Sequence, residues 1–129
     1  MPENYLFEYA VIRVVPHVER EEFLNVGIIL LCAHQKFLKT KFELNEERLR
    51  VLCEKSDFSE LRDHITSFER ICNGGNDAGP IGKLPMPERF RWLTATRSTV
   101  LQTSKVHPGL CPDAGEMLER LFLQLVTKV

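Results

Sequence analysis

The polar side chains that could bind a ligand are concentrated in two short segments. The first, residues 13–27, opens with Arg13 on an otherwise apolar predicted strand and contains Asn25 near its end. A buried guanidinium needs a partner, because an unpaired buried charge costs several kcal/mol. Arg13 therefore either forms an ion pair that holds the following loop or points into a cleft to bind an anionic ligand, and we favour the ion pair. The candidate partners within the chain are Glu8, Glu19, Glu21 and Glu22.

The second segment, residues 89–109, surrounds the single tryptophan, Trp92, with basic and hydroxyl side chains. Guanidinium groups, hydroxyl donors and an aromatic face suit a phosphate, a carboxylate or a nucleotide. The alternative interpretation is a polar loop with Trp92 as a core anchor, since no fixed motif is present. Across both segments, the candidate ligand-binding residues are Arg13, Asn25, Arg91, Arg97, Ser98 and His107. The sharpest hypothesis places an anion between Arg13, Arg97 and His107.

Familiar catalytic and metal-binding motifs are missing from the sequence. Ser98 and His107 could approach each other, but no Gly-x-Ser-x-Gly turn accompanies them. Gly82-Lys83 is not part of a phosphate-binding loop, because Leu84 stands in place of the required serine or threonine. The four cysteines include no Cys-x-x-Cys pair, so we expect buried free thiols and predict neither a metal nor a cofactor. Whether the protein catalyses a reaction stays open.

Composition and length indicate one globular domain over residues 1–129, with 43% hydrophobic and 27% charged residues. The formal net charge of -1 argues against bulk nucleic-acid binding, which normally needs a strongly basic surface. The N-terminus lacks the basic region and cleavage motif of a signal peptide, and no apolar run is long enough to cross a bilayer. We therefore expect a cytoplasmic protein with no membrane partner and disfavour a nucleic acid as its partner.

Apolar patterning predicts three strands at residues 6–15, 23–33 and 37–44, which follow one another as an antiparallel meander. Gly27 lies inside the second strand and marks a bulge or a close approach of two backbones. The run at residues 26–32 is apolar on both faces of this strand, which indicates a central position in the sheet.

Helices are predicted after Asn45 and after Asp57, both suitable N-cap residues. Residues 74–87 are predicted to form a flexible loop rich in glycine and proline. Short strands are predicted at 90–93 and 99–103, and a last helix begins after Asp113. The predicted fold class is α+β: an antiparallel sheet, made of the three-strand meander plus one or two later strands, with two or three helices packed on it.

Four stretches of the chain resemble a family of short bacterial proteins catalogued as domain of unknown function 3037. They are Tyr9–Pro16, Glu22–Leu30, Phe90–Ser98 and His107–Cys111. The resemblance covers nearly the whole chain in the same order and implies a bacterial, cytosolic protein of one domain. It brings no established activity and no catalytic residues. It also implies a candidate protein partner, because relatives are often encoded beside a kinase similar to the HipA toxin kinase.

Three functions remain open. We favour a non-enzymatic interaction or regulatory module, accessory to a HipA-like kinase. The second hypothesis is a small enzyme or binding domain for a phosphate- or carboxylate-bearing ligand. The third is a nucleic-acid-related antitoxin or defence component, against which the near-neutral charge argues.

Overall fold

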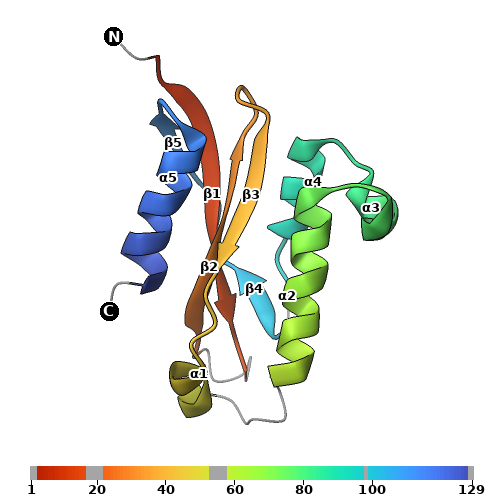
Figure 1. Cartoon of the computed structure of the whole chain (residues 1–129), viewed down its shortest axis with the longest axis vertical. Helices are drawn as coiled ribbons and strands as arrows, with labels where there is room; N and C mark the ends of the chain where they lie inside the picture. Colours follow the sequence, from red (N-terminus) through yellow and green to blue (C-terminus); the bar gives the residue numbers. More distant parts are fainter. Residues whose placement is uncertain (1–2, 17–21, 53–57, 98, 128–129) are drawn as a thin grey trace.

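The computed structural model describes residues 3–16, 22–52, 58–97 and 99–127. Its strands form one antiparallel sheet of five, which lies between two layers of helices (Figure 1). The spatial order is β3-β2-β1-β4, and β5 pairs with the other half of β1, on the side where β4 lies. The bounds are β1 Tyr5–Val14, β2 Leu24–Cys32, β3 Phe37–Phe42, β4 Leu101–Thr103 and β5 His107–Cys111. The predicted α+β class, the meander and the strand within residues 99–103 are confirmed.

Helices α2 and α4 cover one face of the sheet, here called the α2 face, and α5 covers the other, the α5 face (Figure 1). The bounds are α1 Glu46–Leu52, α2 Phe58–Asn73, η3 Asn76–Ala78, α3 Gly79–Gly82, α4 Met86–Leu93, α5 Ala114–Phe122 and η4 Leu123–Thr127. Asp113 caps α5 as predicted, because its Oδ1 accepts the backbone N–H of Gly115 at 2.8 Å and of Glu116 at 3.3 Å. Over the described ranges, no helix combines the length and apolarity needed to cross a membrane.

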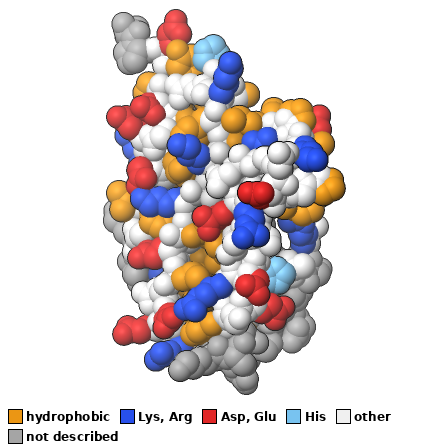
Figure 2. Space-filling model, turned by 45° about the vertical axis from the view of Figure 1, so that its right-hand side comes forward, with side chains coloured by type: hydrophobic (Ala, Val, Ile, Leu, Met, Phe, Trp, Pro, Cys, Tyr) orange, Lys and Arg blue, Asp and Glu red, His pale blue; other side chains and the backbone are white. Residues whose placement is uncertain are grey.

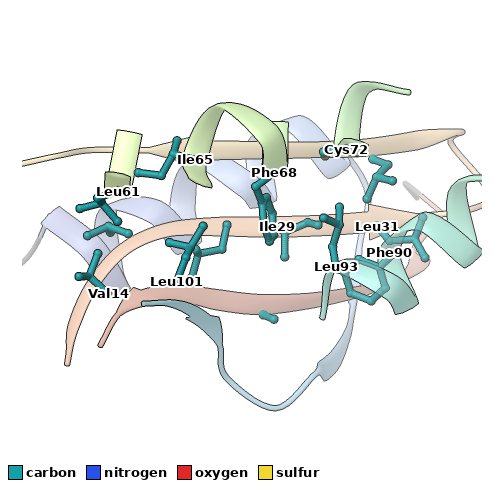
Figure 3. Close-up of a cluster of buried hydrophobic side chains, with 14 of the residues drawn as sticks. Val14, Ile29, Leu31, Leu61, Ile65, Phe68, Cys72, Phe90, Leu93 and Leu101 are labelled. Carbon is teal, nitrogen blue, oxygen red and sulfur yellow. The ribbon is translucent and has the colours of Figure 1, made fainter. Parts of the chain in front are cut away.

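Each face of the sheet buries an apolar cluster of its own, because successive side chains of a strand point to opposite faces. Along β1, Ile12 and Val14 belong to the α2-face cluster, whereas Phe7 and Val11 belong to the α5-face cluster. In Figure 3, side chains of α2 and α4 meet those of the strands in the α2-face cluster. The central strands β1 and β2 are therefore apolar on both faces.

A β-bulge in β2 breaks this alternation at the predicted glycine. Ile12 of β1 lies opposite Gly27, but the next residue, Arg13, lies opposite Asn25, so that Val26 is the extra residue. Because one residue is inserted, Val26 packs in the α2-face cluster and Asn25 turns to the α5 face, where its Nδ2 donates to the carbonyl oxygen of Leu125 at 3.1 Å. The bulge thus places Arg13 and Asn25 side by side on the α5 face.

The prediction of a structureless loop at 74–87 and of a strand at 90–93 was wrong. The short helices η3 and α3 occupy the first of these segments, and α4 spans the end of the first and the whole of the second. Pro87 lies in the first turn of α4, where a helix needs no N–H from it. Phe90 and Leu93, three residues apart, are then buried together against the sheet.

Strand β5 was not predicted, because proline and glycine are disfavoured in strands. It forms by pairing with Tyr5–Tyr9 of β1. Gly109 lies against the ring of Phe7, where a Cβ atom would be 2.5 Å from the nearest ring carbon. Gly109 is unfavourable in a strand by its intrinsic propensity, but only a residue without a side chain leaves room for the Phe7 ring.

Candidate functional site

Arg13 and Asn25 form a partly buried polar pair on the α5 face. The Arg13 guanidinium lies 4.1 Å from the ring centroid of Phe23, and burial lowers its pKa from the ordinary value. The Nε atom of Arg13 and the Oδ1 atom of Asn25 are buried without a hydrogen-bond partner. Two of the expected carboxylate partners, Glu19 and Glu21, lie outside the described residues. The ion pair of Arg13 therefore stays a prediction.

Arg91 of α4 is already paired. Its two terminal nitrogens donate to the two carboxylate oxygens of Glu8, both at 2.8 Å, and this bond raises the pKa of Arg91. The pair connects α4 to β1. It occupies the two terminal nitrogens of Arg91 that would otherwise bind an external anion.

His107 lies in β5 directly opposite Tyr9 of β1, with 5.4 Å between the ring centroids. It therefore shares the α5 face with Arg13. Tyr9, the partner of His107, lies four positions before Arg13 along β1. At the ordinary rise of a strand, this separates His107 from Arg13 by about 13 Å.

Arg97 lies on the opposite side of the sheet, in a small pocket. The pocket has a volume of about 200 Å³ and lies between α2, α4 and the segment that leads into β4. Its lining residues are His64, Ser67, Phe68, Ile71, Trp92, Leu93, Arg97, Thr99 and Leu101. We call it the Arg97 pocket. Ser98, the remaining candidate, lies outside the described residues.

The structure thus does not bring Arg13, Arg97 and His107 together. The alternation of β1 sends Arg13 to the α5 face, whereas Arg97 follows α4 on the α2 face. The residues that do gather around Arg97 include His64 and Ser67 of α2, neither of which was among the candidate residues. Their spacing, with Phe68 and Ile71 at four and seven residues from His64, is the signal of one helix face.

A second hollow, of about 320 Å³, lies on the α2 face where the sheet extends beyond α4. Leu31 is buried at its base, and Leu6, Ala33 and His34 line it. Leu6 pairs in register with Leu110 of β5, and these two side chains are 60% and 63% exposed. We call the set Leu6, Ala33, His34 and Leu110 the sheet-end surface.

The described cysteines, Cys32, Cys72 and Cys111, are buried free thiols, as predicted, and Cys53 lies outside the described residues. In the part of the chain that the structure describes, no group of three His, Cys, Asp or Glu side chains could hold a metal ion. The cysteines therefore belong to the two apolar clusters.

The stability of the fold is expected to fall above pH 9 because of Cys72. Burial raises the pKa of this thiol from 9.0 to about 12, and the nearby positive charge of Arg89 offsets the shift only in part. The unfolded thiol loses its proton at a lower pH than the folded one, so stability is full below pH 9 and declines between pH 9 and 12, by up to about 1.4 kcal/mol per pH unit. Urea unfolding of the wild type and of Cys72→Ala from pH 8 to 10.5 measures this: the variant should show the shallower decline. Parallel declines would contradict the assignment.

The family model for proteins of unknown function DUF3037 matches residues 9–126. No curated protein and no solved structure matches the chain. The matched region contains all of the strands β2 to β5, all of the helices apart from the last residue of η4, and most of β1. On this match over nearly its whole length, the chain belongs to the DUF3037 family of proteins of unknown function.

Proposed function

We propose that the protein is a recognition module that binds a partner protein through the sheet-end surface, and that this partner is a kinase similar to the HipA toxin kinase. The observation that carries the first part is the exposure of Leu6 and Leu110 as a direct cross-strand pair beside a hollow. A single exposed leucine is ordinary, but a contiguous apolar patch at a hollow is typical of a surface that another molecule covers.

The surroundings of the patch favour contact through the face of the sheet and not through its edge. The Glu8–Arg91 ion pair borders the hollow and supplies a polar rim of the kind that surrounds the apolar centre of protein interfaces. Pro108 lies in the edge strand β5 and has no N–H to offer an added strand. A partner would therefore insert apolar side chains against Leu6 and Leu110.

Charge distribution favours a protein partner over a nucleic acid. Figure 2 shows acidic and basic side chains interspersed over the face that it displays. Among the described residues, this face has no basic stripe of the kind on which nucleic-acid binding depends, and the net charge of the chain is -1.

Binding is tested with the full chain and a HipA-like kinase, co-expressed and purified through a tag on the kinase. The double variant Leu6→Lys/Leu110→Lys is expected to weaken binding by roughly 100-fold or more, because each buried leucine contributes about 1.5–3 kcal/mol. Leu123→Lys is the matched control, since Leu123 is 59% exposed but lies in η4, on the α5 face. Calorimetric titration gives the affinities.

The expected pattern is a stable complex for the wild type and the control, and its loss for the double variant. A wild-type chain that elutes alone and monomeric from the co-expression counts against the proposal. Equal affinities of the wild type and the double variant would contradict the sheet-end surface as the contact.

A further inference from the structure

The Arg97 pocket has the construction of a site for a small anion. The side chains that line it and can carry charge, His64 and Arg97, are both bases, and none of the described residues that line it supplies a carboxylate. The Nε2 atom of His64 lies 3.6 Å from a carboxylate oxygen of Glu60, whose side chain is exposed and is not part of the lining. The positive charge of Arg97 therefore has no partner of opposite sign in the pocket lining.

Arg97 is held in place without being neutralised. Its guanidinium lies over the ring of Trp92, with 4.0 Å from Cζ to the ring centroid, and one nitrogen donates to the carbonyl oxygen of Trp92. Among the described residues, this is the one hydrogen bond that the Arg97 guanidinium makes, although a guanidinium carries five N–H donors. Partial burial lowers the pKa of Arg97, which means that the charged form loses solvation that no carboxylate replaces.

The segment that carries Arg97 is fixed by hydrogen bonds before and after this residue in the chain. Thr99 donates through Oγ1 to the carbonyl oxygen of Leu101 at 2.7 Å, and Thr103 donates to that of Thr94 at 3.3 Å. Gln102 donates to the carbonyl oxygen of Thr99 at 2.9 Å. The donors of the site are thus positioned before a ligand arrives, which lowers the entropic cost of binding.

The floor of the pocket is apolar. Phe68, Leu93 and Leu101 are buried there and belong to the α2-face cluster (Figure 3). The pocket volume of about 200 Å³ is enough for a few ligand atoms or several water molecules. A ligand of this size offers a charged head to Arg97 and a short apolar group to the floor.

We propose that the Arg97 pocket binds a carboxylate attached to a small apolar group, with Arg97 holding the carboxylate and with Phe68, Leu93 and Leu101 contacting the apolar part. The hydroxyl group of Ser67 lines the same pocket and can donate to a carboxylate oxygen. One guanidinium matches a planar monoanion in a bidentate arrangement, whereas a phosphate dianion would require more positive charge than one arginine supplies. The proposal does not rest on the sheet-end surface, which lies at another place on the same face.

This chemistry has two sources, a free carboxylic acid or the C-terminal residue of a polypeptide. The probes are 3-methylbutanoate for the free acid and N-acetyl-Gly-Leu for the chain end. The control ligand is N-acetyl-Gly-Leu amide, which keeps the apolar group and lacks the charge. Inorganic phosphate tests the competing anion.

Trp92 is the only tryptophan of the chain and lines the pocket, so its fluorescence reports occupancy directly. We expect a saturable change with at least one carboxylate and none with the amide. Arg97→Gln should weaken binding by about tenfold or more, as expected for losing hydrogen bonds to a charged group. Arg62→Gln is the control, because Arg62 lies on α2, which forms a wall of the pocket, but does not line the pocket and pairs with Glu46 at 2.8 Å.

Stronger binding of the peptide than of the free acid identifies a chain end as the source, and the reverse order identifies a small acid; both support the proposal. Absence of saturation with both carboxylates overturns it, as does tighter binding of phosphate. Equal affinities of the wild type and Arg97→Gln also overturn it. If Arg97→Gln does not fold, the comparison of acid with amide on the wild type decides alone, since equal binding of the two removes the role of the charge.

Discussion

Replacing Gly27 with alanine is expected to lower the free energy of unfolding by about 3 kcal/mol. A Cβ atom at this position would lie 2.7 Å from the carbonyl oxygen of Lys41 and 2.8 Å from a ring carbon of Phe42, both in β3. The ring can rotate, but the carbonyl oxygen belongs to the pairing of β2 with β3 and can move only with the strand. Overpacking of this kind costs 1–3 kcal/mol and reaches the upper end where backbone must shift.

Urea unfolding measures the difference, with Gly115→Ala as the control. Gly115 lies in the first turn of α5, and a Cβ there would meet Asp113 Oδ1 at 3.3 Å as its nearest neighbour. We expect the control to change stability by less than about 1 kcal/mol, the range of an ordinary glycine-to-alanine change in a helix. Equal losses for the two variants would show that the contact with Lys41 does not limit the size of residue 27.

Replacing Arg89 with alanine is also expected to lower the free energy of unfolding by about 3 kcal/mol, because it removes a buried hydrogen-bond donor and leaves a cavity. Arg89 is only 9% exposed, and its Nη1 donates to the carbonyl oxygen of Leu84 at 2.6 Å. Its Nη2 lies 3.5 Å from the carbonyl oxygen of Cys72, in the last turn of α2, where a cation is favoured by the helix dipole. Gly74 passes so close that a Cβ would lie 2.9 Å from the Arg89 Cζ. Alanine would leave a buried carbonyl without its donor and leave a cavity beneath Gly74.

Arg91→Ala is the matched control, because it removes the same side chain two residues later on the same helix. Arg91 is 57% exposed and its ion pair with Glu8 lies at the surface, so the expected loss is at most about 1 kcal/mol. Thermal and urea unfolding of both variants test the contrast. Arg89 also holds α4 against the end of α2, and these helices form two walls of the Arg97 pocket. A loss of stability no larger than that of Arg91→Ala would contradict a structural role for Arg89.

Local patterns were sufficient for much of the scaffold. The alternation of apolar residues identified β1, β2 and β3, and the glycine within the second strand marked the bulge that the pairing of Ile12 with Gly27 and of Arg13 with Asn25 shows. Asp113 predicted the start of α5, since a cap needs only residues within one turn. These features depend on interactions between near neighbours in the chain, which a sequence displays directly.

The errors fell where distant contacts overrule local preference. Residues 90–93 are apolar enough for a strand, but the helix that contains them buries Phe90 and Leu93 together while Arg89 reaches the end of α2. Strand β5 contains proline and glycine and exists because β1 offers a pairing edge and a ring that fits against Gly109. The end of α2 is far from Arg89 in the sequence, and β1 is far from β5, so local patterns could not reveal either contact.

Patterns in the sequence were enough to predict the α+β class, the order of the first strands, the membership of the DUF3037 family and the two segments that hold the candidate ligand-binding residues. Which of those residues share a site depends on the three-dimensional fold. The direction of a side chain depends on strand parity, on a one-residue bulge and on which helix covers each face. For that reason Arg13 and Asn25 face α5, and Arg91 is paired with Glu8. Of these candidates, Arg97 lies in a pocket without a carboxylate among its described lining residues.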